Sequence, residues 1–386
     1  MEHLIHSPLH QIQISGIRKI ATAAARYPDA LALTLGQPDF PTPAHIIAAA
    51  EQAMQQGKTV YTPNAGIPAL RRAAAEFVRN RYGQMYDMDT EVIVTVGASQ
   101  ALDVALRTIL SPGDEVILPG PIYPGYEPLI RLAGGIPVYV DTRSTGFKLT
   151  AELLEPHLSP RTKAVAIGYP SNPTGRVLGE QELAGLANLL RERELFIISD
   201  EIYSELIYDE PHRSISLLPG MRDKTIVING LSKSHSMTGW RIGFTFAPAW
   251  LTAHMLKVHQ YNVSCASSIS QFAAVEALTN GIDDALPMRD AYRERRDYVY
   301  DRLLAMGLEL EKPEGAFYLF PSIAHLHIPS MEFALRLLEE ARVAVVPGDA
   351  FSVYGEGYIR LSYAYAMPVL EKSLDRLEQF VGHLPR

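Results

Sequence analysis

Short runs of apolar and β-branched residues recur through the middle of the chain, separated by stretches in which apolar residues return every three or four positions. Each run has the length of a strand and is too short for a helix. The predicted strands cover residues 91–97, 115–120, 137–141, 164–170, 195–201, 225–230 and 242–248. Helical periodicity marks 98–110 and 180–193 between them. This alternation predicts an α/β fold built on a mostly parallel sheet that is buried on both faces.

The last hundred or so residues follow a different pattern. A charged helical stretch covers 288–307, alternating segments surround 315–321 and 357–364, and an amphipathic helix follows. This pattern predicts a smaller α+β domain. The first 45 residues show no strong periodicity and form either an arm or a part of that smaller domain. We expect a large domain over 46–286, with 1–45 and 287–386 forming the arm and the small domain.

Composition and charge narrow the function classes. The chain has 35 basic and 43 acidic residues, a net charge of −8, which disfavours binding to the phosphate backbone of nucleic acids. Arginines 293, 295 and 296 alternate with acidic residues and predict a solvated helix face. One cysteine allows no internal disulfide, and no Cys/His cluster has zinc-site spacing, so we expect no metal. Without a signal-like start or an apolar run of about 18 residues, we expect a cytoplasmic protein that does not enter membranes.

Residues at or just after the ends of the predicted strands are the candidates for chemistry, because ligands of open α/β sheets bind beyond the carboxyl ends of the strands. They are Ala98, Ser99, Tyr123, Asn172, Asp200, Tyr203, Ser232 and Lys233. The helix that begins near Ser99 would point free N–H groups at this edge, which suits a phosphate. Arg241 precedes its run, so it reaches the same edge only if that strand runs antiparallel to its neighbours. We therefore expect seven strands, one of them antiparallel.

The combination of an acid, a lysine, hydroxyl groups, an amide and an arginine indicates a phosphorylated aromatic cofactor. A nicotinamide dinucleotide would need GxGxxG and a nucleoside triphosphate would need GxxxxGK[ST], and neither string occurs. A lysine that forms a Schiff base, together with an aspartate that pairs with a pyridinium nitrogen, is the arrangement that pyridoxal 5'-phosphate (PLP) requires.

Four strings make this interpretation specific: SNPTG (171–175), SDEIYSEL (199–206), LSKSHSMTGWRIGF (231–244) and GYIRLSYA (357–364). In this order and spacing they resemble the class I aminotransferases, which are PLP enzymes of fold type I. The resemblance covers essentially the whole chain. It implies transfer of an amino group between an amino acid and a 2-oxo acid, by a homodimer whose subunits share their active sites.

The resemblance also implies a role for each cofactor-binding candidate. Lys233 would form the Schiff base and move the proton, Asp200 would pair with the pyridine nitrogen, and Tyr203 and Asn172 would bind the phenolic oxygen. The phosphate would be held by Arg241, Ser232 and the backbone at Ala98 and Ser99. Tyr123 would stack on the ring, and Tyr61 would reach the phosphate of the partner subunit's cofactor. Some relatives carry a further serine at the position of Gly230, or a tryptophan at that of Tyr123.

For the substrate, the resemblance implies that Arg360 binds the α-carboxylate as a bidentate fork, with Asn172 and Gly36 beside it. Similarity in 33–43, 61–66, 111–128 and 259–271 implies N-acetyl-LL-2,6-diaminopimelate and 2-oxoglutarate as substrates, in lysine biosynthesis. An aromatic or aspartate aminotransferase, a PLP-dependent carbon–sulfur lyase and a non-catalytic PLP-binding regulator stay open. No arginine occurs in 261–271, which leaves Arg18 and Lys19 as candidates for a distal carboxylate.

Overall fold

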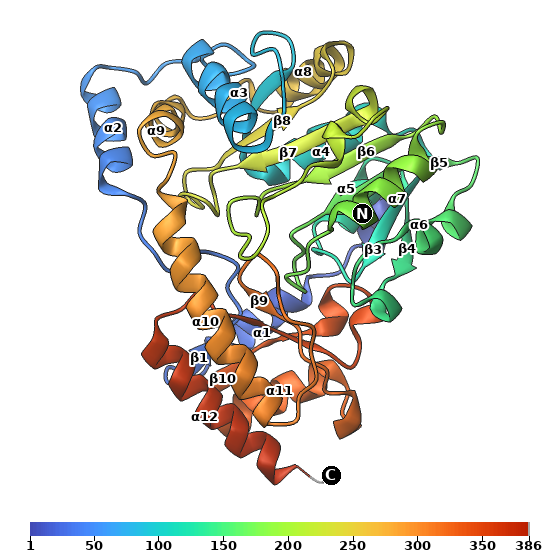
Figure 1. The fold of residues 1–386 in the computed structure, drawn as a ribbon, viewed down its shortest axis with the longest axis vertical. Helices are drawn as coiled ribbons and strands as arrows, with labels where there is room; N and C mark the ends of the chain where they lie inside the picture. The colour runs from blue at the N-terminus through green and yellow to red at the C-terminus, as the bar shows by residue number, and fades with distance from the viewer. Residues whose placement is uncertain (385–386) are drawn as a thin grey trace.

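A sheet of seven strands forms the centre of the computed structural model, which describes residues 1–384 (Figure 1). The strand order is β2-β8-β7-β6-β5-β3-β4. The strands are β2 (Val92–Val96), β3 (Glu115–Gly120), β4 (Ile136–Asp141), β5 (Thr162–Gly168), β6 (Phe196–Asp200), β7 (Thr225–Gly230) and β8 (Ile242–Phe246). Each overlaps one of the predicted runs, so the seven-stranded sheet is confirmed.

One strand of this sheet runs against the others. β8 is antiparallel to both β2 and β7, with Phe244 opposite Val94 on one side and Asn229 on the other. All the other pairs, from β7 through β6, β5 and β3 to β4, are parallel. The predicted antiparallel strand is therefore confirmed, and the start of β8 lies at the same edge as the carboxyl ends of its neighbours.

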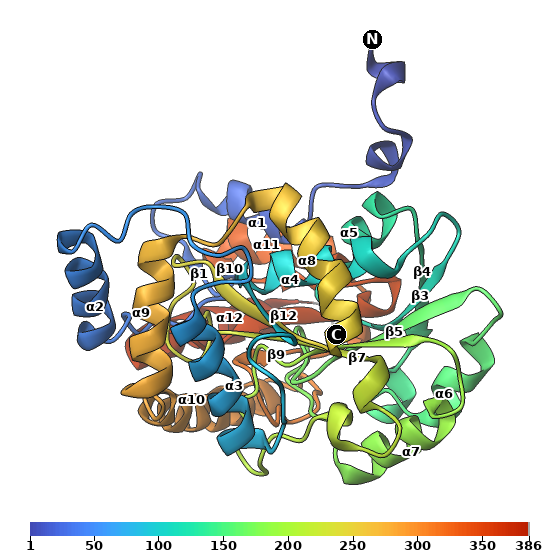
Figure 2. The same cartoon turned by 90° about the horizontal axis from the view of Figure 1, so that it is seen from above.

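Helices cover both faces of the sheet, which explains why its strands are apolar throughout. On β5, Ala164 and Ala166 face one layer and Val165 and Ile167 face the other. The first layer contains α4 (Gly97–Ile109), α5 (Tyr126–Leu132) and α8 (Ala249–Val263). The second contains α6 (Ala151–Leu154) and α7 (Glu180–Leu190), on the opposite side of the sheet in Figure 2. Near β2 and β8 lie α2 (Ala44–Gln55), α3 (Pro68–Tyr82) and α9 (Ser268–Thr279).

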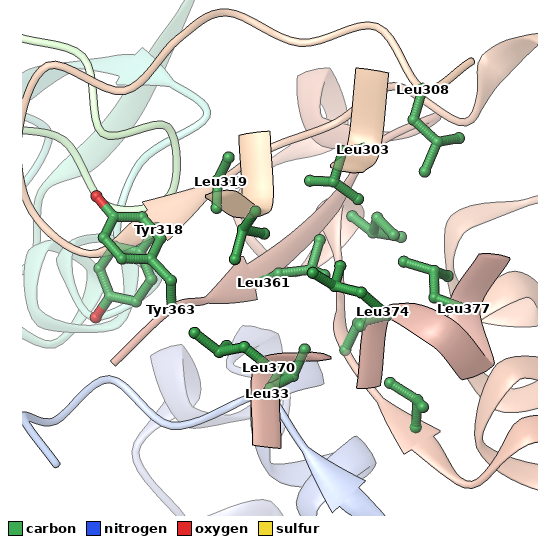
Figure 3. Close-up of a cluster of buried hydrophobic side chains, with 14 of the residues drawn as sticks. Leu33, Leu303, Leu308, Tyr318, Leu319, Leu361, Tyr363, Leu370, Leu374 and Leu377 are labelled. Carbon is green, nitrogen blue, oxygen red and sulfur yellow. The ribbon is translucent and has the colours of Figure 1, made fainter. Parts of the chain in front are cut away.

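A second group of elements builds its own core from the last third of the chain (Figure 3). Its helices are α10 (Ala285–Ala305), α11 (Ser330–Ala341) and α12 (Met367–His383). Its strands are β9 (Tyr318–Leu319), β10 (Val343–Ala344), β11 (Val346–Pro347) and β12 (Ile359–Ser362), of which β11, β12 and β9 form an antiparallel sheet. We call this group, together with the elements of the first 45 residues described next, the small unit. Tyr318 lies at the margin of its core, with its hydroxyl group pointing away from the leucines.

The N-terminal segment contributes to the small unit. Leu31 and Ala32 form β1, which pairs in parallel with Val343 and Ala344 of β10. Upstream lies α1 (Gly16–Ala24), whose Ile20 is buried in the core of the small unit. The residues before α1 extend away from the body of the molecule (Figure 2).

The structure corrects the prediction of a solvated face on α10. Arg296 is only 3% exposed. Its Nη1 donates to the carbonyl oxygen of Pro313 at 3.0 Å and to Asp209 at 3.1 Å, and its guanidinium lies over the ring of Tyr208. The prediction was wrong at this position because loops remote in sequence pack over the helix and supply acceptors. Within residues 1–384, no helix has the length and hydropathy needed to cross a membrane, and no three His, Cys, Asp or Glu side chains cluster as a metal site.

Candidate active site

A cavity of about 600 Å³ lies between the carboxyl edge of the large sheet and the small unit. Its size is within the range of small-molecule sites, about 300–1,000 Å³. The structure brings almost all of the predicted site residues together in its lining: Gly36, Ala98, Ser99, Tyr123, Asn172, Asp200, Tyr203, Ser232, Lys233, Arg241 and Arg360. Tyr61 is the one predicted residue that does not line it.

Lys233 lies in the loop between β7 and β8, where its amine is removed from water. Its Nζ donates to the carbonyl oxygen of Gly36 and lies 5.8 Å from the ring centroids of both Tyr203 and Phe317. Burial, together with the cations of Arg241 and Arg360, lowers the pKa of Lys233 to about 8, against the opposing effect of the charge of Asp200. A large fraction of this amine is therefore neutral near pH 8, as a nucleophile or a base needs to be.

Asp200 ends β6, at the floor of the cavity. One of its carboxylate oxygens accepts a hydrogen bond from the hydroxyl of Tyr126 at 3.0 Å, and the other accepts from the backbone N–H of Ile202 at 3.2 Å. Burial raises the pKa of Asp200 to about 6, although both hydrogen bonds favour the ionised form. A cation placed against this carboxylate would restore its ordinary acidity, which suits a partner for a protonated ring nitrogen. Sequence analysis missed Tyr126 as the residue that orients Asp200.

One end of the cavity is built to hold an anion. Helix α4 begins at Gly97, so its first free N–H groups point into the space lined by Ala98 and Ser99. Arg241 reaches this end of the cavity from the start of β8, as expected for a residue that precedes an antiparallel strand. Gly97 has φ +73°, and a Cβ there would approach Nη2 of Arg241 to 2.4 Å. A side chain at this position would displace the guanidinium from the helix N-terminus.

Tyr203 and Tyr318 form a buried pair between the two units. Their hydroxyl oxygens lie 2.8 Å apart, and both side chains line the cavity. Burial raises the pKa of Tyr203 well above its ordinary value, so the phenol stays protonated and can donate. A Cβ on Gly36 would lie 2.6 Å from the hydroxyl oxygen of Tyr318. Glycine at position 36 therefore leaves room for this tyrosine, which sequence analysis missed because Tyr318 looks like an ordinary core residue of an alternating segment.

Arg360, on β12, is a buried cation with no carboxylate partner within residues 1–384. It is 1% exposed, its Nη2 donates to the carbonyl oxygen of Thr34 at 2.6 Å, and its Nη1 donates to the side chain of Asn172 at 3.0 Å. Its Nε has no acceptor in this part of the chain. Burying an unpaired charge is costly, so the arrangement favours an anionic ligand that completes the guanidinium's hydrogen bonds. Asn172 therefore contacts Arg360 and also lines the cavity.

Tyr61 lies on the surface, 87% exposed. Val60 and Tyr261 are also large and exposed, at 74% and 88%. The loop that carries Val60 and Tyr61 contacts the end of α8, which carries Tyr261, because Asn64 donates to the carbonyl oxygen of Ser264 at 2.7 Å. Adjacent exposed apolar residues of this size are typical of a surface that another molecule covers.

The charges that line the cavity define what it can hold. Four cations, Arg18, Lys233, Arg241 and Arg360, face one acid, Asp200. PLP presents a phosphate, a ring nitrogen that can be protonated and an aldehyde carbon. The α4 N-terminus with Arg241, the carboxylate of Asp200 and the amine of Lys233 provide a matching group for each, so the residues fit this cofactor.

The comparisons with known proteins agree with this geometry. The family model "Aminotransferase class I and II" matches residues 28–377. The chain is 60% identical over 381 residues to a Bacillus subtilis protein named "Probable N-acetyl-LL-diaminopimelate aminotransferase", covering 99% of this chain and 96% of that protein. It is 43% identical to an aspartate aminotransferase of Pyrococcus abyssi, over 96% of each chain.

Among solved structures, an aromatic aminotransferase from Pyrococcus horikoshii superposes with a TM-score of 0.90 at 41% identity, covering 94% of this chain and 98% of that one. The match extends over both the large sheet and the small unit. The predicted fold type I architecture is therefore confirmed, and so is the predicted dependence on PLP, which this family shares. The chain belongs to the class I and II aminotransferases, and it is a PLP-dependent enzyme that acts on amino acids and 2-oxo acids.

Proposed function

We propose that this enzyme transfers the free amino group of N-acetyl-LL-2,6-diaminopimelate to 2-oxoglutarate, or catalyses the reverse reaction, as a step of lysine biosynthesis. The observation that carries the substrate is the 60% identity, over 99% of the chain, to the B. subtilis protein of that name. The aspartate and aromatic aminotransferases are more distant, at 43% and 41%.

The reaction depends on the groups at the sheet edge. Bound PLP supplies an electron sink for the charge that remains on the substrate's α-carbon when its proton leaves. Lys233 would hold the cofactor through its Nζ, and the same Nζ, once free, would accept the proton from the α-carbon of the substrate. Asp200 keeps the ring nitrogen protonated, while Tyr203 donates a hydrogen bond from its hydroxyl toward the phenolic oxygen, next to Asn172.

The remaining predicted residues position cofactor and substrate. Arg241, Ser232 and the backbone of Ala98 and Ser99 hold the phosphate, and Tyr123 lies against the ring. Arg360 binds the substrate α-carboxylate through the donors that protein groups leave free, and Gly36 keeps the backbone close beside it. Asn172 orients Arg360 as well as the cofactor, because it accepts a hydrogen bond from Nη1.

A comparison of amino donors tests the substrate. We expect kcat/KM with 2-oxoglutarate to be highest for N-acetyl-LL-2,6-diaminopimelate, ahead of aspartate, tyrosine and phenylalanine, because this ratio measures differential binding of the transition states. A preference for aspartate or an aromatic donor by more than about tenfold, roughly 1.4 kcal/mol, would contradict the proposed substrate and leave the aminotransferase activity intact.

The same assay separates other chemistries on this scaffold. A carbon–sulfur lyase would release pyruvate from a suitable donor with no 2-oxo acid present, whereas a PLP-binding regulator would turn over neither substrate. We expect turnover to require the 2-oxo acid. The cavity supports this expectation, since Arg360 is available to both an amino acid and a 2-oxo acid.

We further propose a homodimer in which Tyr61 reaches the cofactor phosphate of the other subunit. The exposed surface formed by Val60, Tyr61 and Tyr261 supports a second copy of the chain as the occupant, since Tyr61 is remote from its own cavity. Mixing inactive Tyr61→Ala and Lys233→Ala homodimers should restore activity, because each mixed dimer contains one site with both residues. No recovery after verified subunit exchange would contradict shared sites.

Two other expectations accompany this proposal. We take 46–286 as the large domain and 1–45 with 287–386 as the arm and small domain, with the cavity between them. Pairing of β1 with β10 supports placing the N-terminal segment with the small domain. We also propose a cytoplasmic location, which the single cysteine and the proposed biosynthetic role support. Cell fractionation with an antibody would check it.

A further inference from the structure

One polar side chain in the cavity has no role in the mechanism. Tyr318 lies on β9, is fully buried and lines the cavity. Its hydroxyl group has a single hydrogen-bond partner among residues 1–384, the hydroxyl of Tyr203 at 2.8 Å. Burying a hydroxyl group is costly unless it is hydrogen-bonded, and a phenylalanine would fill almost the same space without that cost. The hydroxyl of Tyr318 therefore indicates a role beyond packing.

The small unit fixes the position of this hydroxyl group. The guanidinium carbon of Arg360 lies over the Tyr318 ring, 4.4 Å from its centroid. Tyr318 pairs with Ser362, so β9 lies beside β12, the strand that carries Arg360. A Cβ on Gly36 would lie 2.6 Å from the hydroxyl oxygen of Tyr318, so the backbone at this position leaves the hydroxyl little room. The small unit thus holds it against Tyr203, which follows β6 of the large sheet.

The proposed role of Tyr203 determines the direction of the hydrogen bond between the two phenols. A phenol has one proton to donate. If Tyr203 donates its proton to the phenolic oxygen of PLP, its own oxygen is left to accept from Tyr318. Burial raises the pKa of Tyr318, and the cation of Arg360 opposes this rise. Tyr318 therefore keeps its proton at neutral pH, and the nearby positive charge polarises its O–H group as a donor.

Asn172, the other predicted partner of the phenolic oxygen, is held in a similar way. Its Oδ1 accepts a hydrogen bond from Nη1 of Arg360 at 3.0 Å, which leaves its amide N–H groups to donate. Each of the two predicted donors to the phenolic oxygen is therefore bonded to a side chain of the small unit. Those two side chains, Tyr318 and Arg360, are in contact with each other.

We propose that Tyr318 is a positioning residue, whose hydroxyl donates to that of Tyr203 and thereby directs the Tyr203 O–H group toward the phenolic oxygen of PLP. This inference rests on the proposed function, in which Tyr203 binds that oxygen. Tyr318 needs no contact with the cofactor for this role. A donor that itself accepts a hydrogen bond is polarised and donates more strongly, so the pair of phenols favours the ionised form of the phenolic oxygen.

A pH titration of the PLP-loaded protein, without substrate, tests the proposal. PLP linked to a lysine changes its visible absorbance when it loses the proton shared between its phenolic oxygen and the linking nitrogen. A donor to the phenolic oxygen favours the deprotonated form, so removal of the donor should move the absorbance midpoint to higher pH. We expect a rise of about 1 to 2 pH units in Tyr203→Phe, which loses a hydrogen bond to a charged group. Tyr318→Phe loses only the polarisation of that bond, so its midpoint should rise by about 0.3 to 0.7.

A double variant shows whether Tyr318 acts through Tyr203. The midpoint of Tyr203→Phe/Tyr318→Phe should equal that of Tyr203→Phe, because the hydroxyl group through which Tyr318 acts is already absent. Tyr363→Phe is the matched control. The hydroxyl oxygens of Tyr363 and Tyr208 lie 3.0 Å apart in the core of the small unit, and neither side chain lines the cavity. The midpoint of this control should be that of wild type.

The outcomes separate the proposal from the function on which it rests. A rise in Tyr318→Phe that disappears when Tyr203 is also replaced supports the proposal. An unchanged midpoint in Tyr318→Phe overturns it, as does a rise of the same size with and without Tyr203, or in Tyr363→Phe. An unchanged midpoint in Tyr203→Phe would instead remove Tyr203 from the phenolic oxygen, and the proposal with it. The titration contains no substrate, so the proposed donor is tested separately by the comparison of amino donors in wild type.

Discussion

The two sides of the cavity differ in how the chain builds them and in what they do. The sheet side takes its residues from loops directly after parallel strands, and from Arg241 before the antiparallel one. The small-unit side brings together Arg18, Thr34, Tyr318 and Arg360, which are spread over most of the chain. In the proposed mechanism the first side holds the groups that react, and the second holds Arg360, which would bind the α-carboxylate of the substrate. Substitutions on the two sides should therefore affect different steps.

Their electrostatics differ in the same way. On the sheet side, burial moves Asp200 and Lys233 toward neutrality: it raises the pKa of Asp200 to about 6 and, together with the cations of Arg241 and Arg360, lowers that of Lys233 to about 8. Such shifts prepare groups for proton transfer near neutral pH. On the small-unit side, Arg360 is a buried cation without a carboxylate partner in residues 1–384, so an anionic ligand would compensate its charge.

The largest effect should come from Lys233→Ala on the sheet side. Removing the group that holds the cofactor and moves the proton should lower kcat by about 10⁴-fold or more. PLP should still bind without a covalent link, because the phosphate contacts are elsewhere. Borohydride reduction and peptide mapping locate the link in wild type, and Lys257→Ala, on the exposed surface of α8, is the control. A label on another lysine would refute the assignment.

The next effect should come from Asp200→Ala, also on the sheet side. Without its carboxylate the ring nitrogen loses the charge that keeps it protonated, so the first half-reaction should slow by roughly 10²- to 10³-fold. Affinity for PLP should change much less. Stopped-flow absorbance measures the half-reaction, and the exposed Asp223→Ala is the matched control. A near-normal rate would exclude the electron-sink role.

Arg360→Lys probes the small-unit side and should give the opposite signature. A point charge cannot replace the guanidinium fork or its bonds to Thr34 and Asn172, so KM should rise by roughly 10- to 100-fold for both substrates. The change in kcat should be small by comparison. Steady-state kinetics measure both constants, with Arg336→Lys on the surface of α11 as control. An unchanged KM would remove Arg360 from carboxylate binding and weaken the contrast between the two sides.

The smallest effect should be a change in the pKa of Lys233, which depends on charges from both sides of the cavity. Only the neutral amine of Lys233 reacts, so covalent uptake of PLP by the apo-protein should accelerate as pH rises through about 8 and then level off. The midpoint should fall in Asp200→Asn, because Asp200 raises the pKa of Lys233, and rise in Arg360→Gln, because Arg360 lowers it. Absorbance at several pH values follows the uptake. A midpoint near the ordinary 10.5 of lysine would show that the amine is not desolvated.

Much of the fold and of the candidate site could be predicted from the sequence because it depends on patterns within short segments of the chain. Short apolar runs indicated the strands of the large sheet, and period-3.6 patterns indicated the helices. Parallel strands place their carboxyl ends at one edge, so residues after successive strands had to meet. The position of Arg241 before its strand even predicted the direction of β8. Tyr318 and Tyr126 were not predicted as site residues. Tyr318 lies in an apolar alternation and Tyr126 follows a turn, and neither pattern indicates that their hydroxyl groups contact Tyr203 and Asp200 respectively.

The sequence by itself therefore determined the seven-stranded sheet, the edge at which the chemistry occurs and the cofactor it suits. The tertiary structure decided which of several equivalent-looking side chains face that edge. Arg296 is buried because loops pack over α10. Arg18 and Lys19 are adjacent cations, but successive helical residues point about 100° apart, and burial of Ile20 turns Arg18 toward the cavity. Such choices depend on contacts between segments distant in sequence, which no local pattern records.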